Sequence, residues 1–477
     1  MNVYRKMASA PYLPRPSTIA LAMALLLSGC AATQVDIEPI PAVELPQKWS
    51  TAADEEQLRP DVGWWKHFGS SELSMLVDEG QRNNFEIAAA VSRVQQAEAQ
   101  ARIAGAPLLP DVDIATSANR EFPLGGGTAT TSASGMLEIG YEVDFWGKNR
   151  AGVAAAEASL RANVYDRETV ALTVTSGIVS TYLQVLSLRD RLAIATQNVG
   201  NAERVLKLVE AQSRAGAASP LDLARQRSAV AGQKAAIPDL KQQERDAQVA
   251  LAILLGRPPQ TFSVAEHGLA DILMPKIAPG LPSELLARRP DIRRAEARLA
   301  EANANVAVAR ANLFPSIRLT GSTGAQSNAL LSLFDGPNLL ANLGASLTAP
   351  IFDGGRLANK RDLAIAQKQE LVQVYRSAVV TALSDVEKTL GSIRSLEERY
   401  RLKSTEVEQA RFAFELSEIR YRVGAEDLMT VLDTQRNLSE AQNQLGQIKL
   451  QRLQATVSLY KALGGGWLDD VGSHAAS

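Results

Sequence analysis

Hydrophobic residues recur at every seventh position through a long stretch of the second half of the chain. The series is Ile365, Val372, Val379, Val386, Ile393, Tyr400, Val407, Phe414 and Tyr421. Mostly small residues stand three positions after several of them, namely Ala382, Thr389, Leu396, Ala410 and Ser417. A seam in which hydrophobic positions are on average 3.5 residues apart is typical of coiled-coil packing. An unbroken helix over this stretch is about 85 Å long. The pattern therefore predicts a rod that packs against other rods.

The first half of the chain carries the same pattern at a constant offset of 208 residues. The matching series is Val164, Ala171, Ile178, Val185, Leu192, Val199 and Leu206. The same offset places 214–217 on 422–425, and Leu255-Gly256 on Leu463-Gly464. A register held over so many positions indicates an internal duplication, so the fold is expected to contain two structural repeats.

Alternating hydrophobic and polar residues precede each long helix. Val112, Ile114, Thr116 and Ala118 alternate with polar partners, a glycine-rich turn follows at 125–127, and alternation resumes from Leu137 to Phe145. In the second half, Ile317 and Leu319 begin the corresponding strand, and the return strand covers 343–351. Segments of about ten residues with a period of two fit tilted membrane-spanning strands. A further helix, beginning near Ser71 and ending before Pro110, is expected to precede the first strand pair. Each half is thus predicted as helix, strand, strand, long helix, helix.

The N-terminus has the features of an export signal. Arg5, Lys6 and Arg15 precede a short apolar segment, which ends at Leu27-Ser28-Gly29-Cys30. This ending resembles the lipobox of bacterial lipoproteins, which implies that Cys30 becomes the lipidated first residue, with N-palmitoyl and S-diacylglycerol groups. Ala31 follows where the family rule puts Asp on lipoproteins retained in the inner membrane, so the outer membrane is implied. The alternative is an ordinary signal peptide in which the only cysteine is incidental.

These patterns divide the chain into six parts. We expect a signal peptide at 1–29, a lipidated tether at 30–62, a first repeat at 63–256, a proline-rich linker at 257–282, a second repeat at 283–467 and a C-terminal tail at 468–477.

Charge and hydropathy exclude several classes of protein. The chain has 50 Lys and Arg against 52 Asp and Glu, which is not the basic balance of a nucleic-acid-binding protein. After residue 30 no run of 18 apolar residues occurs, so no transmembrane helix is expected and any membrane insertion must use strands. His67, His267 and His474 are far apart, and a single cysteine gives no zinc spacing. The sequence therefore predicts neither an enzyme nor a metal site, and no cofactor besides the lipid.

Four strands cannot form a membrane barrel alone, because about eight strands are the smallest number that accommodates interior side chains. Open strand edges are not tolerated in lipid. Several copies must therefore associate, and three copies would supply twelve strands and six helical repeats.

Taken together, these features resemble the TolC-like outer membrane factors, in particular the OprM-like efflux lipoproteins. The resemblance rests on the Cys30 lipobox, Trp64-Trp65, Pro110 and Pro315, the duplication, and the segment 459–467 with its Leu-Gly-Gly-Gly-Trp ending. It implies an α+β channel-tunnel: a homotrimer with a twelve-stranded outer-membrane barrel on a long periplasmic coiled-coil α-barrel. It also implies a passive duct whose periplasmic gate opens when an adaptor (membrane fusion) protein and an inner-membrane pump dock.

Gly424 interrupts the second long helix, and the segment from Leu428 to Arg436 begins the last helix. By the same resemblance, the segment from Tyr421 to Arg436 around this turn is the gate. Asp433 matches the position whose three carboxylates form a constricting ring, and Met429 matches a hydrophobic constriction. Tyr421, together with Arg436, matches a link between neighbouring helix pairs. Three carboxylates near an axis would repel one another and attract cations. Two positions depart from the family pattern: Glu426 stands where an Arg is expected and Thr430 where an Asp is expected.

The sequence leaves alternatives open for the role of Asp433 and for the function of the chain. An Asp early in a helix is ordinarily a solvated residue favoured by the helix dipole, and a heptad seam also occurs in soluble scaffolds. Within the export class, a duct for protein secretion is the alternative to drug or small-molecule efflux. Outside it, the alternative is a structural lipoprotein that bridges the periplasm without conducting.

Overall fold

The structure, a computed structural model, describes residues 44–50, 61–265, 268–329, 332–333 and 335–467. The predicted signal peptide, Cys30 and the 468–477 tail lie outside these ranges, as do His267 and His474. The chain divides into two compact units. A sheet unit contains Gly105–Gly152 and Asn303–Ile365, and a helical unit contains Val153–Ala302, the residues from Ala366 and the helices before the first strand.

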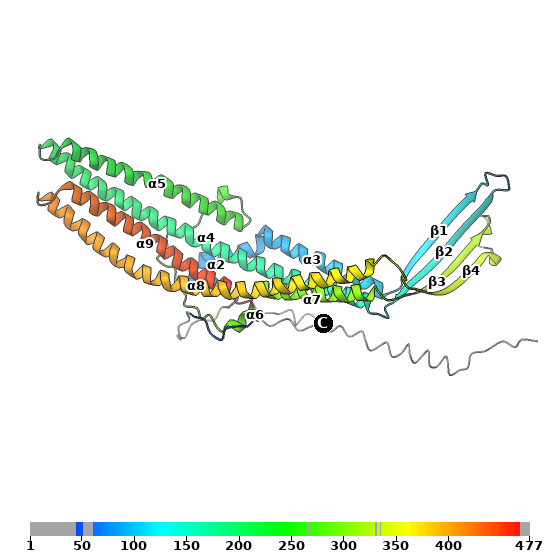
Figure 1. Ribbon diagram of the computed structural model, residues 1–477. Helices are drawn as coiled ribbons and strands as arrows, with labels where there is room; N and C mark the ends of the chain where they lie inside the picture. Colours follow the sequence, from blue (N-terminus) through cyan, green and yellow to red (C-terminus); the bar gives the residue numbers. More distant parts are fainter. Residues whose placement is uncertain (1–43, 51–60, 266–267, 330–331, 334, 468–477) are drawn as a thin grey trace, which may run out of the picture. The chain divides into compact units, whose positions relative to one another are not determined.

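The helical unit is dominated by two pairs of long helices, which run lengthwise in Figure 1. The longest are α4 (Lys148–Arg214) and α8 (Arg356–Arg422), each of 67 residues and each extending into the sheet unit at its N-terminal end. The second helices of the pairs are α5 (Pro220–Leu254) and α9 (Leu428–Ala462), each of 35 residues. Shorter helices are α2 (Ser71–Asn83), α3 (Phe85–Gly105), α6 (Leu285–Arg288) and α7 (Pro290–Ala311). Short 3-10 turns occupy Trp64–Phe68, Ala106–Leu108, Pro259–Thr261, Pro282–Glu284 and Gly336–Asn338.

The heptad seam of α8 faces inward along the whole predicted stretch. Val379 and Val386 are buried in the main core with at most 1% exposure, and Phe414 and Tyr421 belong to a second apolar cluster near the end of the helix. None of the nine seam residues is exposed. In α4 the corresponding Ile178 and Val185 are fully buried. The seven-residue spacing thus marks the buried side of each rod.

The two halves make the same close backbone contact at corresponding positions. Gly256 has a φ of +70°, and a Cβ there would lie 2.4 Å from the carbonyl oxygen of Asn83. Gly464 has a φ of +89°, and a Cβ there would lie 2.1 Å from the carbonyl oxygen of Arg288. Both glycines end the last helix of their half at a point that only glycine can occupy.

The helix predicted from Ser71 to Pro110 is divided in the structure. Ser70, not Ser71, is the N-cap of α2, because its hydroxyl accepts a hydrogen bond from the backbone N–H of Leu73 at 3.0 Å. α2 ends at Asn83, and α3 begins after Asn84. The side-chain oxygen of Asn84 accepts hydrogen bonds from the first N–H groups of α3, while its amide donates to the carbonyl of Leu254 at 2.8 Å. The expectation of one continuous helix was wrong because a capping residue starts a second one.

The sheet unit contains four antiparallel strands in the order β1-β2-β3-β4. They are β1 (Asp111–Glu121), β2 (Thr130–Val143), β3 (Ser316–Ser327) and β4 (Leu339–Thr348). Each half of the sequence supplies one hairpin, and β2 pairs with β3 to join the two hairpins into one sheet.

Two predicted strand ends are wrong. Phe145 lies beyond β2, where its N–H donates to the carbonyl of Val143 and its ring packs edge-on against Trp146 at 4.8 Å. Ile351 lies beyond β4, whose last pair is Thr348 with Ser316; the next pair would join Ala349 to Pro315, which has no N–H. In both places the hydrophobic alternation continues past the last paired residue.

Among the described helices, α4 alone is long and apolar enough to cross a membrane, judged by length and composition. No such helix was expected from the sequence. Half of its most apolar stretch is buried inside the structure, as in the core helix of a soluble protein.

Candidate functional site

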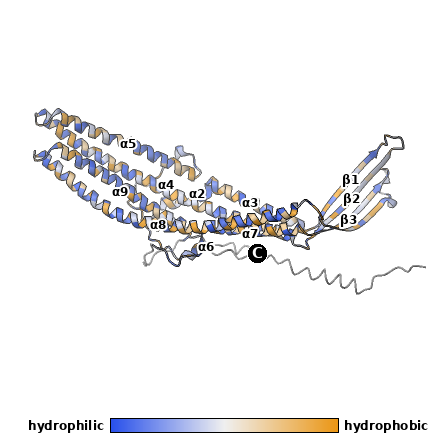
Figure 2. Ribbon diagram, in the orientation of Figure 1, coloured by the Kyte–Doolittle hydropathy of each residue, from blue (hydrophilic) through white to orange (hydrophobic). Residues whose placement is uncertain are grey.

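The sheet has one apolar and one polar face, as the two-residue period predicts. In register across the four strands, Val112, Ile139, Gly321 and Leu343 form one row of the apolar face. The neighbouring row on the opposite face is Asp113, Glu138, Ser322 and Asn342. Figure 2 shows hydrophobic and hydrophilic residues interleaved along the strands. A sheet of this kind can separate an apolar environment from an aqueous one.

Both edges of this sheet are unpaired among the described residues. β1 and β4 each have one neighbour, and every residue of both strands is exposed. On β4, Leu343 and Leu347 are 95% and 70% exposed. Long apolar edge strands offer their backbone groups to further strands, so the sheet is incomplete as it stands.

The predicted gate is a turn between α8 and α9. α8 ends at Arg422, Gly424 has a φ of +76°, and α9 begins after Asp427, whose carboxylate accepts a hydrogen bond from the N–H of Thr430 at 2.8 Å. This bond to the backbone holds the pKa of Asp427 below its usual range. The interruption of the heptad helix near Gly424 and its restart at Leu428 agree with the sequence pattern.

Tyr421 lies inside the turn rather than on its surface. It is 8% exposed and packs in the cluster that contains Phe414, Leu428 and Val431. Burial raises the pKa of its hydroxyl, and the charge of Asp222 at the start of α5 raises it further. Tyr421 therefore connects the end of α8 with the first-half hairpin of the same copy.

Met429, Asp433 and Arg436 follow one another along the exposed side of α9. Met429 is 50% exposed, and an Asp433 side-chain oxygen lies 2.5 Å from a guanidinium nitrogen of Arg436. Together with Arg225, Gly232 and other residues of α5, these three residues line a groove of about 450 Å³. The structure thus brings the predicted constriction residues together on one solvent-facing groove.

The two departures from the family pattern contact each other. Glu426 pairs with Arg420 at 3.3 Å, and the hydroxyl of Thr430 donates to Glu426 at 3.3 Å. One turn further in, the hydroxyls of Ser417 and Thr434 lie 2.8 Å apart. In this chain both positions are used to join α8 to α9 within one copy.

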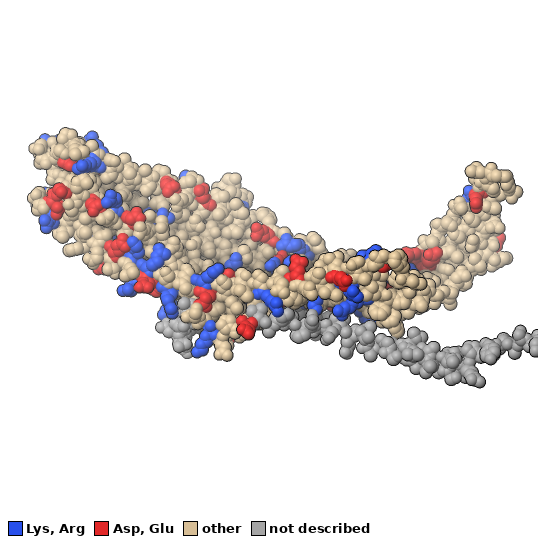
Figure 3. All heavy atoms as spheres, viewed as in Figure 1, with Lys and Arg blue, Asp and Glu red and all other residues tan. Residues whose placement is uncertain are grey.

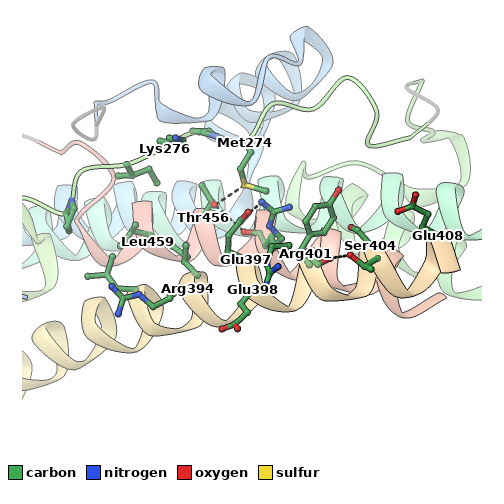
Figure 4. A pocket seen from close by; sticks show the side chains of 18 residues that line it. Met274, Lys276, Arg394, Glu397, Glu398, Arg401, Ser404, Glu408, Thr456 and Leu459 are labelled. Atoms are coloured by element: carbon green, nitrogen blue, oxygen red, sulfur yellow. Dashed lines mark hydrogen bonds and ion pairs between the residues drawn. The ribbon is translucent and has the colours of Figure 1, made fainter. Parts of the chain in front are cut away.

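A larger groove, of about 1200 Å³, runs along α8 and α9 beside the linker segment that contains Met274. Figure 4 shows its lining, in which Arg452 pairs with Glu397 and the hydroxyl of Thr456 lies 3.4 Å from the sulfur of Met274. The guanidinium of Arg452 also lies over the ring of Tyr400 at 4.1 Å.

The corresponding place in the first half is covered by the chain itself. At the 208-residue offset, Arg189 and Glu244 stand where Glu397 and Arg452 stand, and they form the same ion pair with its charges exchanged, at 2.8 Å. There, Arg189 also donates to the carbonyl of Val264, and Val264 is buried. In the second half, the corresponding ion pair between Glu397 and Arg452 lines the open groove.

A contact that sequence reasoning missed is centred on Arg289. Its guanidinium bonds to Asp291 at 2.6 Å, to Asp385 at 3.2 Å and to the carbonyl of Ala462 at 3.1 Å. Arg289 corresponds to Asn84 at offset 205, and Ala462 to Leu254 at offset 208. Following these offsets residue by residue would have found the site, since both side chains donate to the end of the last helix in their half.

A second missed contact joins the start of the helical unit to its end. The ring of Trp64 stacks on Tyr460 at 4.8 Å, and a nitrogen of His67 lies 3.0 Å from the Tyr460 hydroxyl. Burial and the charge of Asp61 raise the pKa of Tyr460 to about 12. A Cβ on Gly466 would lie 2.0 Å from the backbone of Asp61, so glycine at this position allows close packing of the two segments.

Comparison with known proteins gives one consistent answer. Residues 76–257 and 281–465 match the Outer membrane efflux protein family. The chain is 45% identical to the pyoverdine export outer membrane protein OpmQ of Pseudomonas aeruginosa, over 94% of this chain and 96% of that protein. It is 32% identical to the outer membrane protein OprJ of the same organism, over 94% and 95% of the two chains. Among solved structures, the open state of the MtrE outer membrane channel of Neisseria gonorrhoeae superposes with a TM-score of 0.84 at 29% identity, over 91% of this chain and 98% of that one.

The fold, with its two-faced sheet and long paired helices, is that of an outer-membrane efflux channel. The chain belongs to the Outer membrane efflux protein family. It is an outer-membrane transport protein of the TolC-like class and not an enzyme.

Proposed function

We propose that the chain is one third of the passive exit duct of a tripartite efflux pump. Three copies contribute twelve strands to an outer-membrane barrel, and their paired helices form a periplasmic tunnel. The observation that carries the proposal is the sheet, which has an apolar face, a polar face and two edges that no other described strand pairs with. In lipid such edges must be closed, and copies of the same sheet close them in the simplest way.

The partners of this duct are an inner-membrane pump and a periplasmic adaptor, which together supply energy and open the gate. The substrates are drugs or other small molecules. Similarity to OpmQ, a pyoverdine export protein, favours an exported siderophore as one of them. A wide passive duct discriminates little, so the pump selects the substrate.

Anchoring by lipid on Cys30 forms part of the proposal. Two anchors, the covalent lipid and the β-barrel, would then hold the chain in the membrane. Replacement of Cys30 by Ala should abolish incorporation of labelled palmitate, whereas unchanged labelling would show that Cys30 is not the attachment site.

The gate of the duct is the α8–α9 turn, where three copies of Asp433 converge and Met429 adds an apolar constriction. Converging carboxylates repel each other and hold cations. The Arg436 that pairs with each Asp433 limits the repulsion, and Tyr421 connects the turn to the neighbouring hairpin.

Asp433→Ala should therefore raise the single-channel conductance of the resting channel in planar bilayers. Lys449→Ala, on an exposed part of the same helix, is the matched control and should leave conductance unchanged. A resting conductance equal to that of the wild type in Asp433→Ala would show that Asp433 does not constrict the duct.

Accumulation of candidate substrates in a deletion strain tests the export function. Cells that lack the chain should retain the siderophore or drug, and re-expression should restore its release. Retention of secreted proteins, with normal release of small molecules, would instead favour the protein-secretion alternative. A purified protein that never conducts would favour a structural bridge across the periplasm.

A further inference from the structure

Across the described strands, the apolar face of the sheet carries a single charged residue. This is the face that contains Val112 and Ile139, and the charged residue is Arg120. The opposite face holds five acidic residues and one basic residue, namely Asp111, Asp113, Glu121, Glu138, Glu142 and Arg318. In Figure 3 most of the visible surface of the strands is uncharged, and basic and acidic side chains appear together near the tip of the sheet. Arg120 therefore departs from the pattern of its own face.

The apolar face has the height of the hydrocarbon band around a membrane barrel. On β2 it runs from Val143 to Ala133, ten positions apart, which corresponds to about 34 Å of strand. A tilt of about 40° reduces this length to a height of about 26 Å, close to the apolar band of about 25 Å in outer-membrane barrels. Just past Val143, the ring of Trp146 stacks on Phe314 at 4.7 Å, and aromatic residues are enriched where a membrane meets water. The apolar band therefore begins at this end of the strands, near the start of α4.

At the other end of the strands, a polar connection closes over the same face. Leu333, between β3 and β4, packs on Ala133 and Ala325. The neighbouring Ser332 has its hydroxyl 2.8 Å from that of Ser327. Irregular backbone is not tolerated where it faces lipid hydrocarbon. The apolar band therefore ends at the level of Ala133.

Arg120 lies just beyond this boundary. It is in register with Thr131, two residues past Ala133 on β2, so the two side chains lie beside each other on one face. Both residues are exposed. The guanidinium of Arg120 lies over the ring of Phe122, 5.1 Å from its centroid, and it makes no ion pair with any residue that the structure describes. Its N–H donors are therefore available to a ligand at this height.

We infer that Arg120 and Thr131 bind the phosphate of an anionic lipid in the outer leaflet of the membrane. The inference rests on the proposed function, which puts the helices in the periplasm and the far ends of the strands at the outer surface. A guanidinium binds a phosphate through two parallel N–H···O bonds, and the hydroxyl of Thr131 donates a third bond from the neighbouring strand.

The apolar residues next to Arg120 favour a lipid over a soluble anion. Ala118 and Ile114 follow Arg120 on the same face toward the helices, and Ile114 is 78% exposed. The acyl chains of one lipid would cover these residues while its phosphate contacts Arg120. A charge on the lipid-facing side of a barrel is costly at the centre of the membrane but not near its surface. An arginine is therefore tolerated at this level, where it gains an anionic partner.

Lipid binding by the purified protein tests this site. Full-length protein in a neutral detergent is titrated with lipid A, a phosphate-bearing membrane lipid, and the bound lipid molecules are counted by native mass spectrometry. Arg120→Gln should raise the lipid A concentration needed for half-saturation by about tenfold, because the bidentate contact is lost. Arg318→Gln, which changes an arginine of the opposite face, is the matched control and should bind like the wild type. The difference between Arg120→Gln and the wild type should shrink at high salt.

An exchange of the two residues separates the contact from an effect on the fold. Arg120→Thr with Thr131→Arg puts the guanidinium on the neighbouring strand, at the same height and on the same face. This double variant should bind lipid A like the wild type, whereas Arg120→Thr alone should bind as weakly as Arg120→Gln.

Two further ligands identify the source of the phosphate. Dephosphorylated lipid A should bind the wild type about tenfold more weakly than lipid A does, because it offers no acceptor to the guanidinium. Inorganic phosphate, at the same concentration as lipid A, should not displace it, because it makes no contact with the apolar rows.

The outcomes distinguish this inference from the proposed function. Wild-type protein that neither inserts into planar bilayers nor conducts would refute the proposed function, and the inference with it. Conducting wild-type protein that binds lipid A no more tightly than Arg120→Gln would overturn the inference alone. Displacement of lipid A by inorganic phosphate would assign the site to a soluble anion, and an exchange variant that does not recover binding would show that Arg120 acts through the fold. Either result would also overturn the inference.

Discussion

At the scale of single residues, Arg289 joins three elements of the second half. It links the start of α7 to α8 through Asp385 and to the end of α9 through Ala462. Arg289→Met removes the guanidinium donors from both carboxylates and from the carbonyl, and Asp291 keeps only backbone donors such as the N–H of Ile292. We expect a loss of about 2 to 3 kcal/mol in unfolding free energy, below the value for fully buried pairs because both aspartates are partly exposed. Arg422→Met, which removes an exposed pair with Glu418, should cost less than about 1 kcal/mol. Chemical denaturation followed by circular dichroism measures both, and equal losses would contradict a special role for Arg289.

The same site predicts a pH dependence. Burial by itself would raise the pKa of Asp291, but the hydrogen bonds and charge of Arg289 outweigh it and hold that pKa below the usual range. Because the folded pKa is lowered, the stabilisation is complete above the unfolded value of about 4 and is lost as pH falls through the folded value. The stability gap between the wild type and Arg289→Met should therefore narrow between pH 7 and pH 3. A gap that stays constant over this range would show that Asp291 does not depend on Arg289.

Glycine at the end of α9 gives another residue-scale prediction. Gly464→Ala combines a left-handed backbone with a Cβ 2.1 Å from the carbonyl oxygen of Arg288, so the backbone must shift. Gly424→Ala has a similar φ, but its Cβ would meet no atom within 4 Å. The Gly424 variant should cost about 1 to 2 kcal/mol for its backbone conformation, and the Gly464 variant clearly more. Equal thermal unfolding midpoints for the two variants would contradict the close contact.

At the scale of elements, the heptad seam determines which valines of α8 contribute to the unfolding free energy. Val386 is fully buried, whereas Val380, on the same helix, is 56% exposed. Val386→Ala removes packed methyl groups and leaves a cavity, so we expect it to cost about 2 kcal/mol. Val380→Ala should change the unfolding free energy by less than about 0.5 kcal/mol. Similar losses in denaturant titrations would mean that the seam is not the buried side of the rod.

Element positions followed well from sequence wherever a period was long. The seven-residue series located α8 and α4, and alternation located four strands, because burial repeats with the geometry of helix and strand. Boundaries were less accurate where a single interaction decides them. Asn84 starts a new helix through its side chain, and Pro315, which has no N–H, stands where the pairing of β3 with β4 stops. Neither effect repeats, so neither is visible as a period.

The position of the α8–α9 turn was predictable from sequence, but its side-chain contacts were not. Gly424 and the restart at Leu428 placed the α8–α9 turn, and resemblance pointed to Met429 and Asp433 within it. The pairing of Glu426 with Arg420 and Thr430 depends on which side chains face each other across the turn, which a single sequence does not specify. Arg289 was missed because Asp385 and Ala462, two of its three partners, are distant in sequence, and because its residue type differs from that of Asn84, its counterpart in the first half.

At the scale of the whole molecule, one chain presents surfaces that it does not cover. Neither β1 nor β4 has a second neighbour among the described strands, and Phe412, Leu416 and Ile419 are exposed near the end of α8. Membership of an outer-membrane efflux family supplies the reason, since a duct requires a wall that closes on itself. On the proposed function, a single copy is one segment of a hollow assembly, and its exposed surfaces meet the next segment.

The most direct test of this account is the number of chains in the purified mature protein, measured by native mass spectrometry in mild detergent. We predict a species of three chains that persists on dilution. A well-folded single chain, with full helical content and no larger species, would contradict the account.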